Sequence, residues 1–162
     1  MAKIYFTVEH EFTEPPARIW AAMVDWEGHG DWIPATTVDV DPGDPTAVGA
    51  TFTGKTGYGP IMLIDDMVIT EIRWNAETGE GYCEVEKLGP VLKGRAGFDL
   101  SPTASGSRIV WFEDVTVPYL PSVLAPIVNR VSALGFSMAM KKLAKLLADD
   151  PSRYAEPVTS ER

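Results

Sequence analysis

The sequence is poor in the residues that build disulfides and metal centres. Its 162 residues include one cysteine, Cys83, and two histidines, His10 and His29. A lone thiol cannot form an intramolecular disulfide, and so few sulfur and imidazole ligands argue against a zinc site. We therefore expect neither a metal nor a cofactor. A single cysteine also fits a reducing compartment, so we expect a soluble cytoplasmic protein.

Positive charge is scarce as well. The chain has 14 Lys and Arg against 23 Asp and Glu, a formal net charge of −9. An excess of negative charge opposes phosphate backbones and anionic lipid heads, so we expect no nucleic acid and no stable membrane association. The longest stretch without charge, residues 115–129, holds three prolines. We interpret it as too short and too broken to span a bilayer.

What is present is a succession of periodic segments. Residues 3–12 alternate in polarity, which predicts a half-buried strand. The Pro-Pro pair at 15–16 fits the first turn of a short helix. We expect Gly28 and Gly30 to end that helix, before a second short helical piece at residues 31–34.

The remainder divides into a β-rich part and one long helix. Short runs of period two, separated by turn sequences, predict six antiparallel strands between residues 36 and 118. Residues 119–150 carry apolar side chains at intervals of three, four and seven, which predicts one long amphipathic helix. We assign residues 1–150 to a single α+β domain and residues 151–162 to a polar tail.

Five short motifs carry a family resemblance, in this order: Pro-Pro-Ala-Arg-Ile-Trp at 15–20, Trp-Ile-Pro at 32–34, Val-Gly-Ala at 48–50, Gly-Arg-Ala-Gly-Phe-Asp-Leu at 94–100 and Gly-Ser-Arg-Ile-Val-Trp at 106–111. Through them the chain resembles the START/Bet v 1-like (SRPBCC) superfamily, and within it the bacterial polyketide cyclase/dehydrase-like branch. The resemblance implies a helix-grip fold. In that fold a curved seven-stranded antiparallel sheet wraps around a long C-terminal helix, with two short helices between strands 1 and 2 and an apolar cavity inside.

Glu113 is the first candidate for chemistry. Strand 105–117 has a more apolar face that carries Trp111 and Glu113, and we expect this face to point inward. A buried carboxylate takes up a proton or finds a cationic partner. In the helix-grip topology the first and last strands are neighbours, so inward-facing His10 would lie near Glu113 as a general acid and base. The alternative is a structural histidine at the sheet edge and a glutamate at the cavity mouth.

Strand 61–74 is ambiguous because both of its faces carry apolar residues. We take the face with fewer charges as the inner one, which makes Asp66 a second polar anchor. The opposite face would then form an exposed patch that a second subunit of a homodimer could cover, made of Leu63, Met67 and Ile69. A bulge at residues 65–66 that exchanges the two faces is an equal alternative.

Small residues on facing elements indicate a hollow. Gly94 and Ala96 lie on the inner face of one predicted strand and Gly135 lies in the long helix, which leaves either a cavity or close packing. The family resemblance favours a cavity. We expect it to be lined by Trp32, which would gate its mouth, and by Phe52, Phe98, Trp111, Glu113, Ile127, Val131 and Met138.

Three functions follow as hypotheses. The first is a carrier or sensor that binds a small hydrophobic or amphipathic ligand, lipid or polyketide-like, mainly through apolar burial. The second is a polyketide cyclase/dehydrase-type enzyme whose candidate catalytic residues are His10, Asp66 and Glu113. The third is a protein-interaction module or toxin-like regulator that uses the exposed patch.

Overall fold

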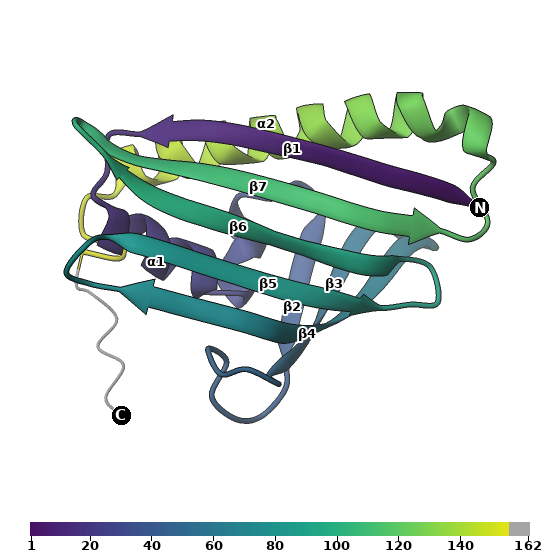
Figure 1. The fold of residues 1–162 in the computed structure, drawn as a ribbon, viewed down its shortest axis with the longest axis horizontal. Coiled ribbons are helices and arrows are strands. Elements are labelled where there is room, and N and C mark those ends of the chain that lie inside the picture. The colour runs from purple at the N-terminus through teal and green to yellow at the C-terminus, as the bar shows by residue number, and fades with distance from the viewer. Residues whose placement is uncertain (156–162) are drawn as a thin grey trace.

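The computed structural model describes residues 1–155 and confirms the predicted helix-grip α+β fold. Seven strands form one curved antiparallel sheet, two short helices join the first two strands, and a long helix follows the last strand (Figure 1). The elements are β1 (Ala2–Phe12), α1 (Pro16–Val24), η1 (Glu27–Asp31), β2 (Thr36–Val40), β3 (Thr51–Tyr58), β4 (Ile61–Asn75), β5 (Glu80–Leu88), β6 (Lys93–Thr103), β7 (Gly106–Val117), η2 (Ser122–Leu124) and α2 (Ala125–Asp149).

The strand order makes the first and last strands neighbours. It runs β1-β7-β6-β5-β4-β3-β2, so β1 pairs with β7, as the resemblance implies. Consecutive strands from β2 to β7 pair as hairpins, which short turns permit in antiparallel sheets. Helix α2 lies alongside β1, and its last turns reach the end of the molecule that holds α1 (Figure 1).

Stacked aromatic rings fill the space beneath α1. Trp20 of α1 stacks on Trp74 with ring centroids 5.2 Å apart, and Trp26 stacks on Phe52 at 4.4 Å. Gly81 is required beside this stack, because a Cβ there would lie 2.6 Å from the Trp20 ring. Aromatic burial of this kind contributes about 0.5–1.5 kcal/mol per ring pair beyond the area buried.

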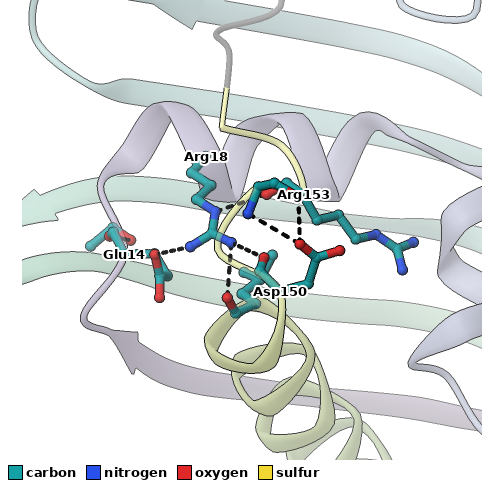
Figure 2. Close-up of polar contacts among 7 residues, drawn as sticks. Glu14, Arg18, Asp150 and Arg153 are labelled. Carbon is teal, nitrogen blue, oxygen red and sulfur yellow. Dashed lines mark hydrogen bonds and ion pairs between the residues drawn. The ribbon is translucent and has the colours of Figure 1, made fainter.

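Arg18 of α1 fastens the C-terminal end of α2. Its guanidinium donates to the carbonyl oxygens of Leu147 at 2.8 Å, Asp150 at 2.7 Å and Arg153 at 2.9 Å, and it pairs with Glu14 (Figure 2). The last carbonyls of any helix lack intrahelical donors. The arginine supplies them from a side chain that is only 10% exposed.

The short helical pieces differ from the prediction. Gly28 and Gly30 do not end a helix before a piece at residues 31–34; both lie inside η1. At Gly30 a Cβ would come within 3.0 Å of the Thr36 carbonyl oxygen. The glycine therefore allows η1 to pack closely against the start of β2, a tertiary requirement that resembles a helix stop in the sequence.

Part of the predicted polar tail packs on the domain. Arg153 pairs with Asp31, and the Tyr154 hydroxyl donates to Asp25 at 2.5 Å. These contacts add to the attachment made by Arg18. Residues 156–162 of the predicted tail lie outside the described residues.

Candidate functional site

A hollow lies between the sheet and the N-terminal half of α2. Its outer part has a volume of about 560 Å³, and an inner part of about 110 Å³ adjoins it beneath η1. Helix α2 contributes Val128, Ser132, Gly135, Phe136 and Ala139 to the outer part. Both parts are lined by Ile33, Thr56, Leu63, Asp65, Lys87, Glu113 and Phe136.

Small side chains create this space. Gly135 lies at the outer part, and a Cβ placed on it would meet no atom within 4 Å. Of the two alternatives at this helix position, a cavity and close packing, the cavity is correct. Ala96 of β6 lines the inner part and is almost fully buried. The apolar lining is suited to excluding water from a small ligand.

A charged cluster, made of Lys87, Asp65 and Glu113, lies where the two parts meet. The Lys87 ammonium forms an ion pair with Asp65 Oδ2 and lies 3.8 Å from Glu113 Oε2. The three side chains are 6%, 12% and 9% exposed. Buried charges of this kind persist in proteins only when paired.

The sheet register explains how the cluster forms. Lys87 of β5 is opposite Gly94 of β6, and Ala96 of β6 is opposite Glu113 of β7. Because Gly94 and Ala96 have little or no side chain, Lys87 can extend over β6 toward Glu113. A large residue at position 96 would stand between them. Ala96 thus serves both the hollow, whose inner part it lines, and the ion pairs.

The pKa values of Glu113 and Lys87 in this cluster are both raised above their ordinary values. Burial raises the pKa of Glu113, and nearby Asp65 raises it further, while Lys87 opposes the shift. Burial lowers the pKa of Lys87, yet Glu113 and Asp65 together raise it above its ordinary value. The two carboxylates thus favour the charged form of Lys87, and burial favours the protonated form of Glu113.

Two polar atoms beside the hollow are left without partners. Among the described residues, nothing bonds to Asp65 Oδ1, an acceptor, and Trp111 Nε1, a donor, forms no hydrogen bond of normal geometry, although it lies near enough to Glu113 to lower the pKa of that carboxyl. Both residues line the inner part. An unsatisfied buried polar atom costs about 1–3 kcal/mol, and the usual explanation is a water or ligand group that completes it.

Asp66 does not face the hollow, so that assignment is corrected. Asp66 is exposed and accepts a hydrogen bond from Thr53 at 2.7 Å, while its neighbour Asp65 points inward. The predicted exposed patch also faces the interior: Ile69 is buried, and Leu63 and Met67 line the hollow.

A bulge explains why the faces of β4 were misassigned. The register shifts between Ile69 and Glu71, further along the strand than the alternative considered at 65–66. The bulge brings Ile72 and Trp74 onto the same side as Leu63. A single alternation cannot describe a strand that contains an extra residue, so the pattern of the second half misled the assignment of the first.

His10 and Glu113 are not brought together. His10 is opposite Ile109 in the β1–β7 register, four residues from Glu113, a separation of about 13 Å along the strand. The His10 ring instead packs edge-on against Phe12 at 4.6 Å. Burial, followed by the charge of Lys141, lowers its pKa. The expected acid and base pair is replaced by the charged cluster.

The residues expected to line the hollow divide into two groups. Phe52, Phe98, Trp111 and Glu113 do line it. Trp32 does not gate the mouth; it is fully buried and packs against the His29 ring at 4.7 Å.

The helix residues expected in the lining point away from it. Ile127, Val131 and Met138 are 61%, 65% and 58% exposed on the outer face of α2. The N-terminal half of α2 is apolar on both faces, so periodicity detected the helix but could not identify the side that meets the sheet. The face of α2 that meets the sheet is set by the following turns of the helix, in which Leu143 and Leu147 are buried.

Two site residues were missed by sequence reasoning. Lys87 continues the inward alternation of Cys83 and Val85, and a lysine on an inner face was the signal that could have revealed it. Phe136 had no such signal. His29 also lines the inner part; it is buried, and its Nε2 donates to the Met23 carbonyl at 2.8 Å.

Comparison with known proteins identifies the fold and nothing finer. No family model and no curated protein matches the sequence. Solved structures do match, among them protein MLL2253 from Mesorhizobium loti (18% identity, 90% of this chain and 97% of that chain, TM-score 0.63) and TTHA0849 from Thermus thermophilus (14%, 91% and 99%, 0.67). Ara h 8.0201, a Bet v 1 family protein, matches with 17% identity over 88% of this chain and 99% of that chain, TM-score 0.56.

Proposed function

We propose that this protein binds one small hydrophobic or amphipathic molecule in the hollow beneath α2, as a carrier or sensor. The observation that carries the proposal is a hollow of about 560 Å³ with an apolar lining and a single charged cluster at its depth. Apolar burial supplies about 25 cal/mol per Å² of ligand surface. The cluster supplies orientation. The polyketide cyclase/dehydrase-like resemblance and the Bet v 1-like fold are consistent with such a ligand.

Binding of an uncharged fluorescent probe tests the proposal. N-phenyl-1-naphthylamine brightens when it leaves water, and we expect saturable binding of one probe per chain. Native mass spectrometry of the purified protein should also reveal a retained guest that organic extraction removes. A protein that binds no probe and retains no guest would overturn the assignment.

Ser132 provides a matched pair of variants. It faces the outer part of the hollow and forms no hydrogen bond among the described residues. Ser132→Phe should occupy the space and weaken probe binding about tenfold or more, equivalent to at least 1.4 kcal/mol. Ser132→Ala should leave the affinity within about twofold. Equal affinities in the two variants would place the probe elsewhere.

A cyclase or dehydrase-type enzyme is the second candidate function. The observation that favours it is Glu113, a carboxyl group with a raised pKa beside the Lys87 ammonium in a water-poor hollow. In a Glu113→Gln variant, retained ligand binding with lost turnover of a polyketide-like substrate would support catalysis. Unchanged binding and turnover would remove Glu113 from the mechanism.

A further inference from the structure

The charges around the hollow restrict what its guest can be. Among the described residues that line either part, Lys87, Asp65 and Glu113 are the only lysine, arginine or acidic side chains. The single cation already faces two carboxylates. His29 also lines the inner part. It remains neutral near neutral pH because burial lowers its pKa to about 4.

The charges of the cluster disfavour both an anionic and a cationic guest. A carboxylate would add a third negative group beside one ammonium, in a site with little water to screen the repulsion. An ammonium would approach the Lys87 ammonium and compete with it for the same two carboxylates. A neutral hydroxyl avoids both costs, because it donates to an oxygen and accepts from a donor.

Hydrogen-bonding capacity in the lining of the inner part fits a hydroxyl. Asp65 Oδ1 lacks a donor, and Trp111 Nε1 forms no hydrogen bond of normal geometry, with Glu113 the acceptor near it. One hydroxyl has the two functions that these atoms lack. Glu113, when it carries a proton, leaves the cluster with no net charge.

We infer that the guest presents an uncharged hydroxyl group to the Lys87–Asp65–Glu113 cluster and that the hollow discriminates against fatty-acid anions. The inference rests on the proposed function and specifies its ligand class. It concerns the polar end of the guest, whereas the apolar lining recognises the remainder.

Three probes with one tail test it: 1-decanol, decanoate and decylammonium, each displacing N-phenyl-1-naphthylamine near neutral pH. We expect decanol to bind about tenfold or more tightly than either ion. Decanoate or decylammonium binding as tightly as decanol would overturn the inference and leave the proposed function intact. If the naphthylamine and all three probes fail to bind, the proposed function itself fails.

A charge variant sharpens the test. Asp65→Asn combined with Glu113→Gln leaves Lys87 as the only charge in the cluster, so the affinity for decanoate should rise about tenfold. Retained binding of N-phenyl-1-naphthylamine serves as the control for an intact hollow. No gain for decanoate in a variant that still binds the naphthylamine would contradict the charge argument. The wild-type comparison remains decisive if the double variant does not fold.

The outer face of α2 carries an independent inference. Its exposed side chains Leu124, Ile127, Val131, Leu134 and Met138, the outer stripe, are 40–65% exposed. Their spacing of three and four places them on one helix face. By length and composition Ser122–Asp149 suffices to cross a membrane, at a mean hydropathy of 1.4 with 11% of the apolar window buried. The opposite face closes the hollow, so this helix is suited to lie on a membrane rather than to cross it.

The charge of this region is opposite to that of the chain. Residues 116–148 contain no Asp or Glu and four cations, Arg130, Lys141, Lys142 and Lys145, in a protein of net charge −9. The three lysines follow the outer stripe on the same exposed helix face. If a second copy packed against this helix through its own residues 116–148, it would offer the lysines no carboxylate, because that segment contains none. An anionic lipid surface offers both an apolar layer and negative headgroups.

We propose that the outer stripe docks reversibly on membranes containing anionic lipids, with the lysines at the headgroups. Flotation with vesicles of phosphatidylcholine, alone or with roughly 30 mol% phosphatidylglycerol, tests this. We expect binding to the anionic vesicles only, weakened by high salt and lost in a Val131→Glu/Leu134→Glu variant that still binds decanol. Absence of anionic-vesicle binding, or binding that the variant retains, would overturn it. A dimer in solution that the variant dissociates would assign the stripe to a second copy instead.

Discussion

The two halves of α2 differ in what their inner face meets. All four buried residues of the helix, Ala139, Met140, Leu143 and Leu147, lie in its C-terminal half, where Arg18 also holds its last carbonyls. The N-terminal half has a hollow on one side and solvent on the other. We conclude that the helix is anchored at one end, and that the other end provides a wall of the hollow at little cost in stability.

The largest difference is expected from one leucine in each half. Leu143→Ala empties a fully buried position and should lower the free energy of unfolding by about 3 kcal/mol. Leu134 is 62% exposed, so Leu134→Ala should change it by less than about 0.5 kcal/mol. Urea denaturation measures both. Equal losses would mean that the N-terminal half is also part of the stabilising core.

The anchor itself is the next test. Arg18→Met keeps the length of the side chain but removes the guanidinium that donates to the carbonyl oxygens of Leu147, Asp150 and Arg153, a loss of about 2–3 kcal/mol. Lys145→Ala is the control, since it removes only an exposed ion pair with Asp149 at the same end of α2, worth under about 1 kcal/mol. If Arg18→Met costs no more than the control, the contacts in Figure 2 do not anchor the helix.

Acid should weaken the fold through His29, a buried residue of η1. Its folded-state pKa of about 4 is below the ordinary 6.5, so the folded protein binds fewer protons than the unfolded chain between these values. The stability contribution is complete above 6.5 and is lost as pH falls through 4. At pH 5 we expect a loss of about 2 kcal/mol.

A His29→Gln variant isolates this effect from that of Glu113. The raised pKa of Glu113 has the opposite sign, because its stabilisation is present below 4.5 and is lost as pH rises. The difference in unfolding free energy between wild type and His29→Gln, measured at pH 7 and pH 5, therefore reports the histidine alone. An unchanged difference would mean that His29 is not buried in its neutral form.

The smallest effect is expected in the N-terminal half of α2, which borders the hollow. Gly135→Ala adds a methyl group where no atom lies within 4 Å, and alanine is the better helix former by up to about 1 kcal/mol. We expect a slight rise in the thermal midpoint with the binding of 1-decanol preserved. A loss of stability would indicate that the helix packs more closely there than the hollow implies.

Alternation and composition were sufficient for the architecture. The strands, the long helix and the inward direction of Trp111 and Glu113 were predicted, because a sheet face or helix stripe that meets a core must repeat at its own period. Asp66 was chosen wrongly over Asp65 because the bulge after Ile69 interrupts that period. Lys87 was overlooked because its partners come from strands distant in sequence.

By itself the sequence determined that this chain builds an antiparallel sheet followed by a long terminal helix, and it placed small residues between them without deciding between a cavity and close packing. The tertiary structure alone decided which face of α2 meets the hollow and which carboxylates surround Lys87. The physical reason is that periodicity shows which residues of one helix or strand share a face, whereas a site depends on how separate strands and helices are aligned with one another. Where both faces are apolar, as in β4 and the first half of α2, only packing against the rest of the fold selects one.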